Sequence, residues 1–296
     1  MNPLAVSLAW HRLVLGLVLA GCTLLAQAIT ITDDRGRRLQ FDAPPQRVVS
    51  LLPSSTESLC EMQQCQRLVG TDRYSNWPES VRSLPKVGGG IDPNIEAIVA
   101  LKPDVVLLSV SSRVSDRLEA LGLKVVALEP KTHADVRRVL NIIGDLFAVP
   151  REQGADRLWR VIDAAVQAAA QSLPPRARGA RVFFEVSRGP YAAGPASFIG
   201  ETLARLGVRN VVPADLGPFP RLSPEYLLRA QPELIMLSNR SAQPPALYPG
   251  WHHLAAIQAG RLCIFGPEQA DVLVRPGPRM AEAARLMAAC LSEKFS

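Results

Sequence analysis

Residues 101–109 read Leu-Lys-Pro-Asp-Val-Val-Leu-Leu-Ser, and residues 230–238 read Ala-Gln-Pro-Glu-Leu-Ile-Met-Leu-Ser. Both segments place a proline and an acidic residue before a continuous apolar run, which is typical of a buried strand in a parallel sheet. Glu96 and Glu225 lie at the same distance before the two prolines. The copies are about one domain length apart, so we predict two related α/β lobes.

The sequence around each copy alternates between short apolar runs and helical patterns. Such alternation predicts parallel sheets covered by helices on both faces. The strands are expected at 47–52, 105–108, 124–128, 181–186, 234–237 and 262–265, the helices at 57–62, 95–101, 114–121, 198–206, 225–230 and 278–295, and a hairpin at 29–41.

One long helix interrupts the alternation at residues 150–174, where apolar residues recur at helical spacing between Pro150 and Pro174. The predicted fold is therefore two Rossmann-like α/β lobes with mostly parallel sheets, joined by a single long rigid helix. The expected N-terminal lobe covers residues 29–149 and the C-terminal lobe residues 175–296.

Residues 1–28 have the features of a signal peptide, because an apolar run at 13–20 follows Arg12. Cleavage after Ala28 would release a soluble periplasmic protein, whereas the segment ending at Cys22 fits a lipobox and would give a lipoprotein. We favour soluble release. No later apolar run is long enough to span a membrane.

Composition excludes several classes of protein. With 48% hydrophobic and 20% charged residues among 296, the chain is typical of a globular protein. Its net charge of +6 is spread thinly, so we expect no nucleic-acid partner. We see no nucleophile–base pair and no cysteine or histidine cluster for a metal, so we expect neither catalytic residues nor a metal site.

Export would place the cysteines in an oxidising compartment, where disulfides form. Cys60 and Cys65 are close in sequence, but a continuous helix would hold their Cα atoms about 8 Å apart, too far for a disulfide. We therefore predict that they pair, provided that the helix ends near Met62 or Gln63.

Two kinds of surface residue are candidates for function. Glu96 and Glu225 follow the N-cap residues Asn94 and Ser223, so they either complement helix dipoles or form a symmetric docking pair. Tyr74, Tyr191, Phe219 and Asp271 are expected in loops after strands, where ligands of parallel sheets bind. The alternative for the aromatic residues is anchoring of loops to the core.

Three segments carry a resemblance to a known family: Arg47 to Glu57 (Arg-Val-Val-Ser-Leu-Leu-Pro-Ser-Ser-Thr-Glu), Val69-Gly70 followed by Tyr74-Ser75, and Ile95 to Asp104. With the signal peptide, they resemble the helical-backbone substrate-binding proteins of bacterial ABC importers, which carry cobalamin, heme or iron–siderophore complexes. The resemblance covers residues 45–295 and is closest to the cobalamin-binding members.

The resemblance implies a monomer that delivers a corrinoid such as cobalamin, as transported ligand and not as cofactor, to an ABC permease dimer with its ATPase. Heme or a ferric siderophore is the second possible ligand, and an exported α/β enzyme is the third interpretation. Glu96 and Glu225 would contact arginines of the permease, and Tyr74, Tyr191, Phe219, Asp271 and Arg275 would surround the ligand. The inter-helix disulfide of the family has a counterpart only at Cys290, because its partner position near Leu206 is not cysteine.

Overall fold

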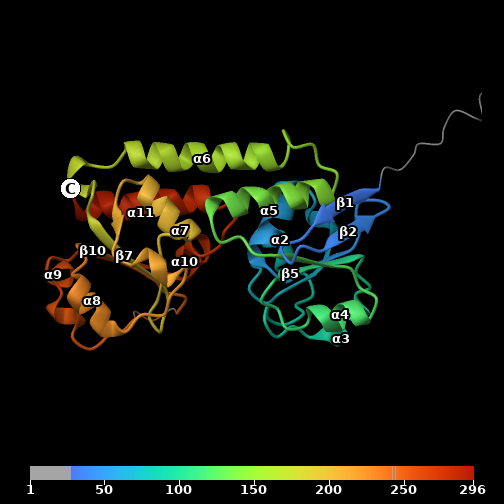
Figure 1. Cartoon of the computed structure of the whole chain (residues 1–296), viewed down its shortest axis with the longest axis horizontal. Coiled ribbons are helices and arrows are strands. Elements are labelled where there is room, and N and C mark those ends of the chain that lie inside the picture. The colour runs from blue at the N-terminus through green and yellow to red at the C-terminus, as the bar shows by residue number, and fades with distance from the viewer. Residues whose placement is uncertain (1–27, 242, 244) are drawn as a thin grey trace, which may run out of the picture.

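The computed structural model describes residues 28–241, 243 and 245–296. Two α/β lobes lie side by side, and helix α6 (Ala155–Gln171) lies along the C-terminal lobe and reaches the edge of the N-terminal lobe (Figure 1). The predicted two-lobe α/β fold is confirmed. The predicted signal peptide, apart from its last residue Ala28, and the candidate lipid-bearing Cys22 lie outside the described residues.

The N-terminal lobe contains a hairpin and a four-stranded parallel sheet in the order β4-β3-β5-β6. The hairpin is antiparallel, as predicted. The strands are β1 (Ile29–Thr32), β2 (Arg38–Phe41), β3 (Val48–Ser50), β4 (Leu68–Thr71), β5 (Val105–Ser109) and β6 (Val125–Leu128), and the helices are α2 (Pro53–Glu61), α3 (Ile95–Ala100), α4 (Ser115–Ala120) and α5 (His133–Leu146).

The C-terminal lobe contains a sheet in the order β11-β10-β7-β8, in which only β8 is antiparallel, and β9 also pairs with β7. Its strands are β7 (Arg181–Ser187), β8 (Tyr191–Ala192), β9 (Arg209–Asn210), β10 (Leu234–Ser238) and β11 (Leu262–Phe265). Its helices are α7 (Phe198–Arg205), α8 (Pro224–Ala230), α9 (Ala255–Gln258), α10 (Pro267–Leu273) and α11 (Met280–Lys294).

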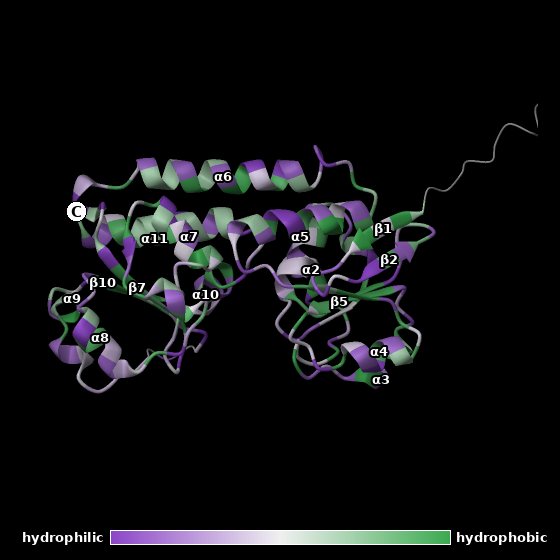
Figure 2. Cartoon of the chain, viewed as in Figure 1, coloured by the Kyte–Doolittle hydropathy of each residue, from purple (hydrophilic) through white to green (hydrophobic). Residues whose placement is uncertain are grey.

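Each sheet is buried on both faces. In β5, for example, Val105 and Leu107 belong to a core that extends through both lobes, whereas Val106 and Leu108 belong to a second core confined to the N-terminal lobe. Figure 2 shows these strands as hydrophobic ribbons inside the lobes. Because the shared core includes α5, α6 and α11, a continuous apolar layer joins the lobes on the α6 side.

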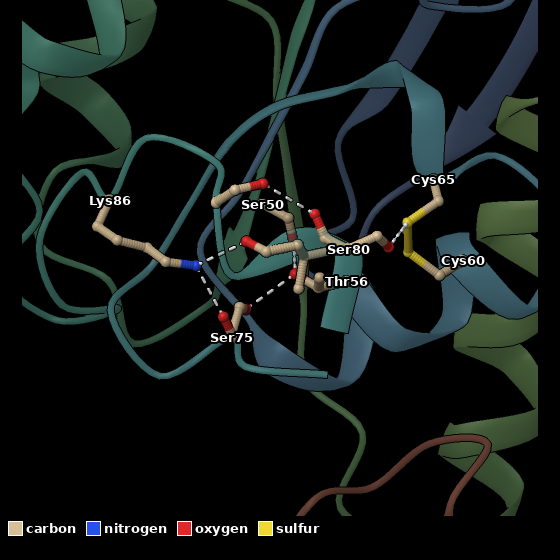
Figure 3. The surroundings of a disulfide bond; sticks show 9 residues. Ser50, Thr56, Cys60, Cys65, Ser75, Ser80 and Lys86 are labelled. Carbon is tan, nitrogen blue, oxygen red and sulfur yellow. Dashed lines mark hydrogen bonds between the residues drawn. A yellow bond between two sulfur atoms is a disulfide. The ribbon is translucent and has the colours of Figure 1, made fainter. Parts of the chain in front are cut away.

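Two disulfides are present. The predicted Cys60–Cys65 bond is confirmed: α2 ends at Glu61, and Gln63 turns the chain with a φ of 60°, so that the Cα atoms lie 4.1 Å apart. Figure 3 shows this bond beside a group of polar side chains that includes Thr56 and Ser80.

The second disulfide joins Cys263 of β11 to Cys290 of α11, with Cα atoms 6.2 Å apart. The sequence analysis did not predict this bond, because the family resemblance pairs Cys290 with a position near Leu206 that is not cysteine. Within the described part of the chain, no helix combines the length and the apolar character that a bilayer span requires.

Candidate ligand-binding site

A cavity of about 350 Å³ lies between the two lobes. Its walls come from segments that follow the carboxyl ends of β3, β5, β6, β7 and β10, which is where ligands bind in parallel sheets. The lining residues are Leu52, Pro53, Ser54, Tyr74, Ser109, Leu128, Glu129, Pro130, Lys131, Val186, Phe198, Phe219, Arg240, Val274, Arg275 and Pro276.

Two aromatic side chains face this cavity from opposite lobes. Tyr74 is 54% exposed and Phe219 is 36% exposed, so both offer free ring surface. Phe219 rests on Phe198, with ring centroids 6.0 Å apart. Phe198 is itself fixed to the N-terminal lobe, because its backbone N–H donates to the Lys131 carbonyl at 2.6 Å. The cavity therefore offers aromatic surface from both lobes to a flat, largely apolar group.

Charged side chains lie at the cavity from both lobes. Lys131 and Arg240 are each more than half exposed, and their nearest carboxylates are Glu129 at 3.9 Å and Asp271 at 3.5 Å, respectively. Ser109 donates a hydrogen bond to Glu129. These groups can meet polar or anionic substituents on the edge of an apolar ligand.

Arg275 is held by the protein itself. Its side chain is only 4% exposed, donates a hydrogen bond to Glu57 at 2.6 Å and forms an ion pair with Asp271 at 2.8 Å. It also donates to the Asn76 side chain and to the Tyr74 carbonyl, both at 2.9 Å. Burial raises the pKa of the Glu57 carboxyl, and the charge of Arg275 opposes this effect.

The structure brings three of the five predicted ligand-binding residues to the cavity, namely Tyr74, Phe219 and Arg275. Asp271 borders a smaller neighbouring cavity of about 170 Å³, and its expected place in a loop is wrong: it lies in helix α10, which begins at Pro267 directly after β11.

Tyr191 does not line the main cavity. The expected loop position is again wrong, because Tyr191 begins the short strand β8 and pairs with Ser187. Its ring lies 6.0 Å from the guanidinium of Arg221.

Sequence reasoning missed several residues of the site. Two of them could have been found from the sequence. Glu57 is part of the segment that carries the family resemblance, and Asn76 lies two residues after Tyr74. Phe198, Lys131 and Arg240 gave no such signal, because only the folded chain brings them to one cavity.

A second buried carboxylate, Glu185 of β7, lies behind the cavity wall, next to the lining residue Val186. Tyr248 donates to its Oε1 at 2.9 Å and accepts a hydrogen bond from the Gly189 N–H at 2.8 Å. Burial raises the pKa of Glu185 to about 6, although the Tyr248 hydrogen bond and the charge of Arg188 oppose this shift.

Glu96 and Glu225 both lie in the first turn of a helix, as predicted. Helices α3 and α8 that carry them lie on the side of the molecule opposite α6, one on each lobe (Figure 1). Asn94 caps α3 by accepting from the Ala97 N–H, whereas the side chain of Ser223 makes no capping hydrogen bond to α8. Hydrogen bonds from the backbone N–H of Glu225 and from Ser223 instead lower the pKa of the Glu225 carboxyl.

Comparison with known proteins identifies substrate-binding relatives of this chain. The chain is 26% identical over 272 residues to the uncharacterized ABC transporter substrate-binding lipoprotein YvrC of Bacillus subtilis, covering 88% of this chain and 84% of YvrC. It is 25% identical over 257 residues to the vitamin B12-binding protein of Pectobacterium atrosepticum, covering 85% and 90% of the two chains.

Among solved structures, a periplasmic heme-binding protein from Pseudomonas aeruginosa superimposes with a TM-score of 0.69 at 25% identity, covering 85% of this chain and 94% of that protein. The family model described as periplasmic binding protein matches residues 48–268, which is most of the chain. The chain therefore belongs to the periplasmic binding protein family of ABC importers, whose members bind substrates for transport and are not enzymes.

Proposed function

We propose that this protein binds a corrinoid such as cobalamin in the cavity between its lobes and delivers it to an ABC permease in the bacterial envelope. The observation that carries the proposal is the pair of exposed aromatic rings, Tyr74 and Phe219, which face one cavity from opposite lobes. A corrin is a broad, mainly apolar disc, and aromatic walls bind such a disc through its faces.

The edge of the cavity suits the edge of that ligand. Corrins carry amides on their rim, and Ser109 and Glu129 can form hydrogen bonds with them. Cobalamin also carries a phosphodiester, with which Lys131 or Arg240 can form an ion pair. The similarity to a vitamin B12-binding protein supports the same ligand class.

Heme is the second candidate, and one observation favours it. Tyr74 is half-exposed at the cavity, and a tyrosine hydroxyl can serve as an axial ligand of heme iron. Calorimetry with cyanocobalamin, cobinamide and hemin distinguishes the two candidates. Binding of a corrinoid supports the proposal, whereas binding of hemin alone reassigns the ligand and leaves the transport role intact.

Glu96 and Glu225 are proposed to dock the two lobes onto the permease. Both carboxylates belong to equivalent helices on one side of the molecule, so they suit a partner with twofold symmetry that presents a basic site on each subunit. Exposed charges contribute little to stability but strongly affect orientation and association.

The double variant Glu96→Ala/Glu225→Ala tests this docking surface. We expect unchanged ligand affinity and a complex with the permease that is at least tenfold weaker. Asp116→Ala is the matched control, because Asp116 is also an exposed acidic residue in a first helical turn. If the double variant forms the complex normally, the docking proposal is wrong, and the two glutamates only complement the dipoles of their helices.

A further inference from the structure

We propose that Glu57 and Arg275 form an interlobe clamp that positions Tyr74 at the cavity, so that ligand affinity depends on Glu57 although Glu57 does not line the cavity. This inference rests on the proposed function, since it assigns positioning residues to the same site. It also changes the role that the family resemblance implied for Arg275, from a ligand contact to a positioning residue.

The clamp joins segments that are far apart in sequence. Arg275 lies between α10 and α11, and Glu57 lies in α2 of the other lobe, 218 residues earlier. One terminal nitrogen of Arg275, Nη1, donates to Glu57 Oε1 at 2.6 Å and to Asn76 Oδ1 at 2.9 Å. The other, Nη2, donates to the Tyr74 carbonyl at 2.9 Å. A single guanidinium therefore holds α2 and the turn that carries Tyr74.

Asp271 completes the connection. Its Oδ2 forms an ion pair with Arg275 at 2.8 Å and accepts a hydrogen bond from the side-chain amide of Asn76 at 2.9 Å. Next to the clamp, the Gly277 backbone packs closely against α2, because a Cβ at Gly277 would lie only 3.3 Å from atoms of Ser54. Segment 271–277 of the C-terminal lobe is thus fixed to the N-terminal lobe at several points.

Burial makes the clamp rigid. The side chains of Arg275 and Glu57 are 4% and 1% exposed. Within the described residues, Glu57 Oε2 has no hydrogen-bond partner, so the Arg275 contact is the main compensation for burying this carboxylate. A ligand group would have to break these contacts before it could bind the Arg275 terminal nitrogens.

Tyr74 depends on the clamp for its position. Its backbone N–H donates to Asp72 at 3.0 Å, and its carbonyl accepts from Arg275, so the backbone is held at both ends while the ring remains half-exposed. Loss of Arg275 would free the carbonyl and the interlobe contact together. Binding would then have to order the turn again, which lowers affinity.

The test separates positioning from stability. Arg275→Met leaves the buried Glu57 carboxylate with only Arg279, at 3.9 Å, and Glu57→Leu leaves the buried Arg275 with Asp271 as its remaining carboxylate, so both single variants should unfold more easily. The double variant Glu57→Leu/Arg275→Met removes both charges and should regain much of that stability. We expect its affinity for the ligand that the wild type binds, cyanocobalamin or hemin, to stay at least tenfold weaker, because the Tyr74 carbonyl has lost its Arg275 donor.

A second readout does not need a ligand. Spin labels at the exposed positions 116 and 229, one on each lobe, report the interlobe distance. We expect a narrow distribution in the wild type and a broad one in the double variant. Arg138→Met is the matched control, because Arg138 pairs with Asp34 and Asp135 inside the N-terminal lobe, and it should change neither readout.

The outcomes distinguish this inference from the proposed function. Wild-type affinity and an unchanged distance distribution in the double variant would overturn the clamp. If the wild type binds neither ligand, the proposed ligand class fails, and the distance distribution alone decides about the clamp. Should the double variant not fold, Glu57→Gln replaces it, because the amide keeps the acceptor oxygen but loses the charge. We then expect an intermediate affinity or a partly broadened distance distribution. Wild-type values in both measurements would overturn the clamp.

Discussion

Replacing the buried Glu185 with glutamine should stabilise the protein at neutral and alkaline pH. Burial raises the pKa of Glu185 from an ordinary value of 4.5 to about 6, so the fold disfavours the charged carboxylate. Glutamine keeps the oxygen that accepts from Tyr248, and its amide nitrogen replaces Oε2, which has no hydrogen-bond partner among the described residues. The variant therefore removes the charge with little change in contacts.

The sign and the size of this effect depend on pH. A carboxyl whose pKa is higher in the folded state destabilises the fold once pH rises above the unfolded pKa, and the full penalty is present above the folded pKa. The difference between 4.5 and about 6 corresponds to roughly 2 kcal/mol. We expect Glu185→Gln to gain up to ~2 kcal/mol at pH 8, less than ~1 kcal/mol at pH 5, and nothing below pH ~4.

Urea unfolding at pH 5 and pH 8 measures this difference directly, because the other titratable groups contribute equally to both proteins. The exposed Glu293→Gln is the control and should change the free energy of unfolding by less than ~0.5 kcal/mol at either pH. A Glu185→Gln variant that is destabilised at pH 8, or whose effect is the same at both pH values, would refute the reasoning.

The remaining predictions concern the disulfides and the cavity wall. The Cys263–Cys290 bond closes a loop of 27 residues and the Cys60–Cys65 bond a loop of 5. Replacing both cysteines with serine should therefore lower the free energy of unfolding by ~3.5 kcal/mol for the first bond and by only ~2 kcal/mol for the second. Urea unfolding gives the ranking, and the reverse order would contradict it. Phe219→Ala should weaken ligand binding by about 1–3 kcal/mol in calorimetry with little change in stability, since the ring is partly exposed; an unaltered Kd would remove Phe219 from the site.

The sequence predicted the architecture well because the fold repeats local patterns. The two Pro-acidic-apolar segments became β5 and β10, each an inner strand of its lobe's sheet. The apolar stripe after Pro150 became α6, although the helix starts only at Ala155. The Cys60–Cys65 bond required a helix that ends near Met62 or Gln63, and the positive φ of Gln63 confirms that the chain turns there.

What the sequence analysis placed wrongly or did not predict has two causes: a local signal that was overlooked, and contacts that no local pattern encodes. Asp271 was expected in a loop because it follows a predicted strand, yet proline at the first helical position is a helix start, and α10 begins at Pro267. Cys263 and Cys290 pair through tertiary structure, which spacing alone does not define. The role of Arg275 followed from a family position, but its burial against Glu57 is visible only in the folded chain.

The central claim is that a corrinoid binds between the lobes, and an equilibrium titration of the purified protein with cyanocobalamin, followed by gel filtration, tests it most directly. The account predicts that corrin absorbance co-elutes with the protein at one ligand per chain, and that Phe219→Ala reduces the amount retained. Elution of the protein without corrin absorbance, together with retention of hemin by the same preparation, would contradict the claim.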